Sequence, residues 1–199
     1  MGAAYVGVIL SARGPRALTV EAAADVLGMR GSARAVGVFV DEPVAHVARL
    51  ARLLALDVVQ LHGREDASFV AELRAQTDAA VWKALRVRDP AEAAAAAAVF
   101  GPLVDGILLD GFMEGTEGGA GVRFDWAAVA DVRAALAAGT LLVVAGGLTP
   151  DNVADAVAAL RPDVVDVSSG VESRVCRKSE ARMRAFIDAA RTTAGRSGS

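Results

Sequence analysis

The sequence predicts one α/β domain of the (β/α)8 barrel type, built from strand–helix units that follow one another along the chain. Short apolar runs alternate with alanine-rich amphipathic runs, with a period of about twenty-five residues. Apolar residues make up 54% of the 199-residue chain, enough for a large core. Two glycine turns, Ala145–Gly147 and Ser168–Gly170, follow the last two apolar runs. A pair of anion-binding turns after the last two strands is typical of this barrel.

Seven runs are expected to be strands. Each is almost continuously apolar, as in a parallel sheet that is covered on both faces. In chain order, the expected strands are Tyr5–Leu10, Ala35–Val40, Val58–Leu61, Ala80–Ala84, Gly106–Leu109, Leu142–Ala145 and Val164–Val167.

Seven amphipathic runs are expected to be helices. They are Val20–Leu27, Val44–Leu54, Ala67–Gln76, Pro90–Phe100, Trp126–Ala137, Asp151–Leu160 and Glu180–Ala194. Several of these helices start with residues that favour a helix N-terminus: Thr19, Asp89 followed by Pro90, and Thr149 followed by Pro150.

The number of units falls short of a closed barrel. A barrel of this type has eight βα units, whereas the sequence provides seven. The missing unit is expected to be the first, because a strand begins almost at once, at Tyr5, and the last two units carry the glycine turns. An open doubly wound sheet, which tolerates seven strands, is the alternative. We expect one incomplete barrel domain over residues 1–194 and a disordered tail over residues 195–199.

Composition and charge exclude several classes of function. The net charge is −3 with both signs interspersed, so no basic face for nucleic acid is expected. No apolar run approaches the ~20 residues that span a bilayer, and the N-terminus lacks the pattern of a secretory signal. Cys176 is the only cysteine, which excludes a disulfide framework and favours a reducing cytoplasm. The sequence leaves both a monomer and a homodimer open.

The two glycine turns predict a phosphate site. Glycine lets backbone N–H groups approach an anion closely, and the helix that follows adds partial positive charge at its N-terminus. Gly146, Gly147, Ser169 and Gly170 are expected to bind the phosphate of a small phosphorylated metabolite. No residue cluster has the spacing of metal ligands, so no metal is expected.

Polar residues that follow the other expected strands are candidates for chemistry, because barrel active sites lie at those strand ends. Asp110 ends an apolar run and precedes the glycine-rich segment 115–121, a kind of loop that closes over substrates. We predict that Asp110 is a general acid; a helix cap or an ion-pair partner is the alternative. Arg16 lies in a loop fixed by Gly14 and Pro15, which suits a substrate carboxylate or a solvated surface position.

Four further residues have side chains that could take part in a site. Gln60 and His62, at the end of the third strand, are candidate substrate contacts; a buried, hydrogen-bonded ring is the alternative for His62. A Schiff base at Lys83 is chemically conceivable, but nothing near it in sequence argues for one. Cys176 lies among cationic residues and is interpreted as non-catalytic, because no base lies near it in sequence.

Six strings of the sequence occur in a characteristic order. They are Val36–Asp41, Val58–Gly63, Leu108–Asp110, Gly118–Trp126, Ala145–Val153 and Asp166–Glu172. In this order they resemble the phosphoribosylanthranilate isomerases of tryptophan biosynthesis, over nearly the whole chain. The strings Gln-Leu-His-Gly and Ser-Ser-Gly-Val-Glu are specific when they are found together.

The resemblance implies a (β/α)8 barrel enzyme without a metal or organic cofactor. That family converts N-(5-phosphoribosyl)anthranilate to 1-(2-carboxyphenylamino)-1-deoxyribulose 5-phosphate by an Amadori rearrangement, an aldose–ketose isomerisation. The family's general acid corresponds to Asp110, and its arginine for the anthranilate carboxylate corresponds to Arg16. Its phosphate turns correspond to the two glycine turns.

The sequence departs from the family at functional positions. The family's general base is a cysteine in a first strand that ends Lys-Ile-Cys-Gly, and that string is absent here. Ala120 replaces a threonine and Gly14 a serine. We expect a start downstream of the natural one rather than a true fragment, and we expect the 199-residue chain itself to be poorly soluble and inactive. Another phosphosugar barrel enzyme and a phosphate-binding pseudoenzyme are the alternative functions.

Overall fold

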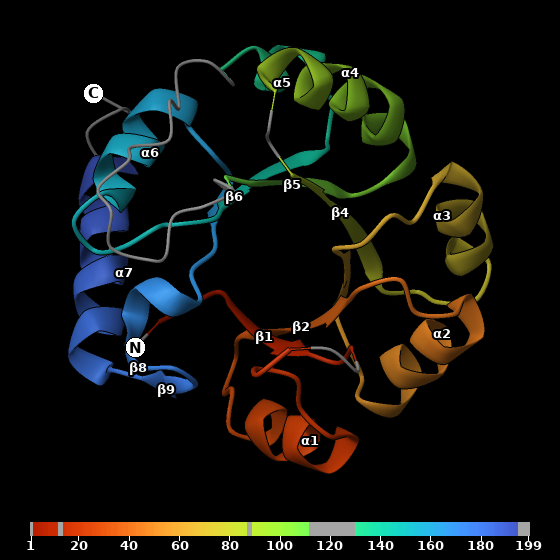
Figure 1. The fold of residues 1–199 in the computed structure, drawn as a ribbon, viewed down its shortest axis with the longest axis horizontal. Helices are drawn as coiled ribbons and strands as arrows, with labels where there is room; N and C mark the ends of the chain where they lie inside the picture. The colour runs from red at the N-terminus through yellow and green to blue at the C-terminus, as the bar shows by residue number, and fades with distance from the viewer. Residues whose placement is uncertain (1, 12–13, 87–88, 112–129, 195–199) are drawn as a thin grey trace. The chain divides into compact units, whose positions relative to one another are not determined.

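The structure is a computed structural model that describes residues 2–11, 14–86, 89–111 and 130–194 (Figure 1). These residues form two compact units. The N-terminal unit comprises Gly2–Ala84 with Leu103–Gly106, and the C-terminal unit comprises Leu85–Pro102 with the chain from Ile107 onward. The segment 115–121, Ala120 within it, and the tail 195–199 lie outside the described residues.

In the N-terminal unit, parallel strands lie in chain order and a helix joins each strand to the next. The elements are β1 (Tyr5–Ile9), α1 (Val20–Gly28), β2 (Arg34–Phe39), α2 (Val44–Leu53), β3 (Val58–Leu61), α3 (Ala67–Arg74) and β4 (Ala80–Arg86). In register, Tyr5 lies beside Arg34, Val36 beside Val58, and Val58 beside Ala80. A helical crossover between parallel neighbours is the βαβ arrangement that the alternating pattern predicts.

The C-terminal unit repeats the strand–helix alternation and ends in a hairpin and a long helix. Its elements are α4 (Pro90–Phe100), β5 (Gly106–Asp110), α5 (Ala130–Ala135), β6 (Leu141–Ala145), α6 (Val153–Leu160), β7 (Val164–Val165), a 3-10 turn (Ser169–Val171), β8 (Glu172–Arg174), β9 (Arg177–Lys178) and α7 (Glu180–Ala194). Strand β6 pairs with β7 in parallel, whereas β8 and β9 pair antiparallel. Helix α6 packs against α7, and α4 packs against α5.

Strands β2 to β6 are buried along most of their length, whereas most residues of β1, β7, β8 and β9 are not buried. All four residues of β3 are buried, and so are four of the five residues of β6. The helices turn small side chains toward the sheet: Ala23, Ala48, Ala97 and Ala156 have no exposed surface. Alanine at these positions lets the helix backbone lie close to the strands, which explains why this residue dominates the apolar fraction.

The expected strands and helices are confirmed, and several differ by a few residues at their ends. Thr19 caps α1 by accepting a hydrogen bond from Ala22 N at 3.2 Å. Asp89 caps α4 in the same way, from Ala91 N at 2.7 Å. Helix α5 is described from Ala130 onward, and the start expected at Trp126 lies outside the described residues.

Two details of the C-terminal unit correct the sequence-based expectation. Helix α6 starts at Val153 with Asn152 as its N-cap residue, rather than at Asp151 with Thr149 as the cap. The reason is a tight turn in which the Asn152 side chain accepts a hydrogen bond from Thr149 N at 2.8 Å. The hairpin of β8 and β9 was not predicted, because strands this short and this charged show no apolar alternation.

Across the described ranges, no helix is both long and apolar enough to cross a bilayer.

Candidate active site

The first glycine turn adopts a backbone that favours glycine. Gly146 and Gly147, directly after β6, have φ angles of +80° and +68°. Residues with a Cβ pay a steric cost in this left-handed region. A Cβ on Gly146 would also collide with the Asp110 carboxylate and with the Gly111 N–H group. The sequence therefore needs glycine at 146 for two independent reasons.

The second glycine turn contacts the first. A Cβ on Gly170 would collide with the carbonyl oxygen of Leu148, which lies in the turn after β6. The Asn152 side chain donates to Gly147 O at 3.0 Å and so directs that carbonyl toward α6. The structure thus brings the predicted phosphate residues Gly146, Gly147, Ser169 and Gly170 into one cluster within the C-terminal unit.

Asp110 lies beside this cluster. It is the last residue of β5 and is half-buried. The main chain that follows it is held to the first turn, because Gly111 N donates to Ala145 O at 3.2 Å. A carboxyl group beside a set of backbone N–H groups can, in its acid form, donate a proton to a substrate that those groups hold.

Gln60 and His62 form a second group, in the N-terminal unit at the end of β3. The amide nitrogen of the Gln60 side chain lies 3.1 Å from Nδ1 of His62, and Gln60 is only 4% exposed. The His62 main chain continues the sheet pairing, because its N–H donates to Phe39 O at 2.8 Å. The amide fixes the orientation of a half-buried imidazole, so the two predicted substrate contacts act as a pair.

A buried ion pair underlies this second group. Nζ of Lys83 lies 2.9 Å from Glu65 Oε2, and the two side chains are only 4% and 2% exposed. Lys83 also donates to Gly63 O at 2.7 Å. Glu65 in turn accepts hydrogen bonds from Asp41 N at 2.9 Å and from Gly63 N at 3.0 Å. The pair fastens the loop that follows His62 to the loop that follows β2.

This network assigns Lys83 a structural role and reveals a residue that the sequence argument missed. Because Nζ of Lys83 is held by Glu65 and by the Gly63 carbonyl, it is not free to attack a carbonyl group, which disfavours a Schiff base. Glu65 has no recognisable signature in the sequence. Its burial depends on a lysine 18 residues further along the chain.

Arg16 lies in the turn after β1 and is half-buried. Ala17 N donates to Gly14 O at 3.2 Å, and Ala17 forms a parallel bridge with Ile9. These contacts hold the part of the Arg16 loop that runs from Gly14 to Ala17. Cys176 is exposed at the tip of the β8–β9 hairpin. Among the described residues, no group of three or more His, Cys, Asp or Glu is arranged to hold a metal ion.

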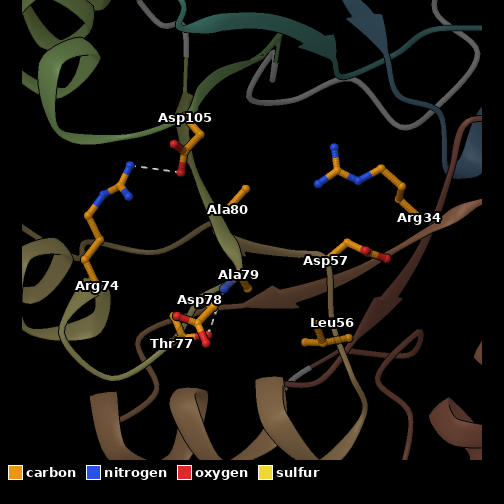
Figure 2. Close-up of a pocket in the computed structure, with 9 residues that line it drawn as sticks. All are labelled: Arg34, Leu56, Asp57, Arg74, Thr77, Asp78, Ala79, Ala80 and Asp105. Atoms are coloured by element: carbon orange, nitrogen blue, oxygen red, sulfur yellow. Dashed lines mark hydrogen bonds and ion pairs between the residues drawn. The ribbon is translucent and has the colours of Figure 1, made fainter.

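A polar hollow lies at the N-terminal ends of the strands in the N-terminal unit, opposite to the strand ends that carry Gln60 and His62. Its volume is about 500 Å³, and Figure 2 shows Arg34, Asp57, Arg74 and Asp105 on its walls. These residues lie at or before the N-terminal ends of the strands, whereas Gln60 and His62 lie at the carboxyl end of β3. The carboxylates of Asp57 and Asp105 are occupied by backbone N–H groups of Ala35 and Val81, each at 2.7 Å. We assign no substrate to this hollow.

Comparison with known proteins identifies the family. The family model "N-(5'phosphoribosyl)anthranilate (PRA) isomerase" matches residues 1–189. The N-(5'-phosphoribosyl)anthranilate isomerase of Pseudomonas fluorescens is 39% identical over 196 residues, which cover 96% of this chain and 89% of that protein.

Solved structures agree with the sequence comparison. The phosphoribosyl anthranilate isomerase of Thermotoga maritima superposes with a TM-score of 0.85 at 31% identity, over 96% of this chain and 89% of that one. A family structure solved in complex with reduced 1-(o-carboxyphenylamino)-1-deoxyribulose 5-phosphate gives a TM-score of 0.81 at 30% identity, over the same shares of the two chains. The strand–helix alternation described above is therefore an α/β fold of the TIM-barrel kind. This chain belongs to the N-(5'-phosphoribosyl)anthranilate isomerase family and is an isomerase of tryptophan biosynthesis.

Proposed function

We propose that this chain binds N-(5-phosphoribosyl)anthranilate through the two glycine turns and isomerises it to 1-(2-carboxyphenylamino)-1-deoxyribulose 5-phosphate. The observation that carries the proposal is the close approach of Asp110 to Gly146. A phosphorylated sugar held on the glycine turns would extend past a carboxyl group, as the first step of an Amadori rearrangement requires. The seven βα units correspond, in this proposal, to seven of the eight units of a (β/α)8 barrel.

The phosphate is held mainly by the main chain. N–H groups of Gly147, Ser169 and Gly170 face an anion in this proposal, with the two turns contributing from opposite sides. The contact between Gly170 and the Leu148 carbonyl keeps the turns at a fixed separation. Because backbone donors need no side-chain ordering, such a site is pre-formed before the substrate arrives.

Asp110 is the general acid of the proposed reaction. Its proton passes to the furanose ring oxygen, the C1–O bond breaks, and the nitrogen lone pair forms the C1=N bond of a Schiff base. Loss of a proton from C2 then gives an enolamine, which tautomerises to the ketone. We assign the acid step to Asp110 and leave the C2 base without an assignment among the described residues. Cys176, on the exposed hairpin, is not that base.

In this proposal, residues at the carboxyl ends of β1 and β3 recognise the rest of the substrate. Arg16 pairs with the anthranilate carboxylate, for which a guanidinium offers two parallel donors. Gln60 and His62, already paired at 3.1 Å, contribute polar contacts as one group. No cofactor takes part in this scheme.

Two further points belong to the proposal. A biosynthetic isomerase of this kind works in the cytoplasm, as the single cysteine also favours. The chain acts as a monomer or a homodimer; a Thermotoga maritima family member is described as dimeric.

Asp110→Asn tests the proposal. In a chain extended by the family's first βα unit, turnover of N-(5-phosphoribosyl)anthranilate is expected to fall by about 10²–10⁴-fold, because an amide cannot donate the proton. Binding of the reduced product analogue, measured by calorimetry, is expected to stay within about threefold, because the shape is kept. Retention of more than a tenth of the activity would show that another group is the acid. Tight binding of the analogue without turnover by the unaltered chain would favour a phosphate-binding protein instead.

A further inference from the structure

A side-chain network lies behind the second glycine turn. Nζ of Lys178, on β9, donates to the carbonyl oxygen of Ser168 at 2.8 Å and lies 3.3 Å from its hydroxyl oxygen. The same Nζ lies 3.1 Å from Oε1 of Glu172, on β8. An ammonium group has three N–H donors, and these contacts supply a partner for each. Lys178 is therefore committed to the protein and is not itself a phosphate ligand.

The contact with Ser168 sets the direction of a peptide plane. In a trans peptide, the C=O and the following N–H point in opposite directions. Lys178 holds the Ser168 carbonyl on the hairpin side of the turn, so the N–H of Ser169 must face the other way. Since Ser169 begins the 3-10 turn, this N–H is one of the first unpaired donors that a 3-10 turn presents.

Glu172 makes this arrangement rigid. Its side chain is 5% exposed, and it also accepts a hydrogen bond from Cys176 N at 3.3 Å. Its own carbonyl oxygen accepts from the Arg182 guanidinium at 2.9 Å, which connects the hairpin to α7. The Lys178 side chain is 42% exposed, but a buried carboxylate with several partners restricts its position more than a surface carboxylate would.

We propose that Lys178, held by Glu172, is a positioning residue for phosphate binding, acting through the Ser168–Ser169 peptide. This inference rests on the proposed function, since it presumes that the Ser168–Gly170 turn receives the substrate phosphate. The β8–β9 hairpin is in this view part of the binding machinery, although it touches no substrate. Lys178 acts by geometry rather than by its charge alone.

The test compares Lys178→Met with Arg177→Met in the full chain. The control removes the same charge one residue away, and within the described part of the chain the Arg177 side chain forms no hydrogen bond or ion pair. Inorganic phosphate is the probe, titrated by calorimetry and by the amide NMR shifts of Gly147 and Ser169. We expect Lys178→Met to weaken phosphate binding about tenfold and to raise KM by a similar factor with kcat nearly unchanged. Arg177→Met should leave both values unchanged, and Lys178→Arg should recover most of the loss.

The outcomes separate this inference from the proposed function. If phosphate moves neither the Gly147 nor the Ser169 amide of the unaltered chain, the phosphate site itself is wrong. If phosphate moves both amides but Lys178→Met binds as tightly as Arg177→Met, only the positioning role is overturned. Should Lys178→Met unfold, the double variant Glu172→Gln with Lys178→Met leaves no buried charge. That variant must still show the tenfold loss for the inference to stand.

Discussion

The carboxylates at the N-terminal ends of the strands have a different role from those at the carboxyl ends. At the N-terminal ends, Asp57, Asp105 and Asp163 repeat one arrangement: each exchanges a pair of hydrogen bonds with one residue of the preceding strand. For Asp57 the partner is Ala35, whose N–H donates to the carboxylate at 2.7 Å and whose carbonyl accepts from Asp57 N at 2.9 Å.

The other two aspartates repeat the arrangement closely. Asp105 forms the same pair of bonds with Val81, at 2.7 and 2.8 Å, and Asp163 forms it with Leu142, at 2.8 and 2.9 Å. Figure 2 shows the side chains of Asp57 and Asp105 and the ion pair of Asp105 with Arg74. Two of the carboxylates also meet an arginine: Asp105 lies 2.9 Å from Arg74, and Asp163 lies 2.8 Å from Arg133.

At the carboxyl ends, the described acidic residues Asp110, Glu65 and Asp41 each have different surroundings. Asp110 lies against a glycine turn, Glu65 is buried with Lys83, and Asp41 accepts a hydrogen bond from Arg64 N at 2.6 Å. The repeated arrangement serves the sheet, whereas the surroundings at the carboxyl ends differ with the role: Glu65 holds two loops together, and Asp110 lies against the predicted phosphate turn. The difference teaches that the local pattern of hydrogen bonds, and not the residue type, separates structural from functional carboxylates in this fold.

The largest effect on stability is expected for the structural ion pair of Lys83 with Glu65, at the carboxyl ends of the strands. Lys83→Met should lower the free energy of unfolding by about 3–5 kcal/mol, because it leaves the Glu65 carboxylate buried without its cation. Urea unfolding measures the change. The double variant Glu65→Gln with Lys83→Met should recover most of it, and a loss below about 1 kcal/mol for the single variant would mean that water reaches Glu65.

A carboxylate at the N-terminal end of a strand should stabilise the chain at neutral pH, lose this effect in acid, and have no effect on phosphate binding. Burial raises the pKa of Asp163, but hydrogen bonds from Leu142 N and Arg133 outweigh it and hold the pKa below its ordinary 3.8. A group with a lowered pKa contributes stability at neutral pH, and this contribution is lost as the pH falls below about 4 toward the folded-state pKa.

Asp163→Asn should therefore destabilise the chain by about 1–2 kcal/mol at pH 7 and by less as the pH falls below about 4. Unfolding curves at several pH values measure this trend, and phosphate affinity should not change. A variant that lost phosphate binding while folded would break the comparison between the two strand ends.

The smallest effect concerns the hairpin tip. Cys176 has a φ angle of +63°, a region in which a side chain carries a steric cost. Cys176→Gly should raise stability by about 0.5–1 kcal/mol, the relief of strain less the greater entropy of glycine in the unfolded chain. Cys176→Ala is the control, and thermal unfolding should show no gain for it. Equal gains for both variants would mean that the thiol, not the backbone, is unfavourable.

Much of the fold was predictable because it is local. Helix α4 and strand β3 were predicted with their observed bounds, since the apolar runs and the cap residue Asp89 lie next to one another in sequence. The β8–β9 hairpin was not predictable in this way. Its stability comes from Glu172, whose partners are spread over β9, the hairpin tip and α7.

The candidate residues of the site could be predicted from the sequence, but the residues that hold them in place could not. The glycine pairs and Asp110 stand out in the sequence because their residue types are unusual at strand ends. The support depends on contacts between distant residues, such as Lys83 with Glu65 and Gly170 with the Leu148 carbonyl. No local pattern encodes such a contact, so the residues that hold a site in place are found only from the folded chain.

The collision that any side chain at Gly170 would make with the Leu148 carbonyl has a consequence for protein engineering. Neither glycine turn can be grafted onto another scaffold alone, because the two turns pack directly against each other. The transferable part is a single cassette that runs from Gly146 through Lys178, with α6 and the hairpin included. A designer who copied only the glycine strings would obtain loops of the right sequence with nothing to keep their N–H groups converging on one anion.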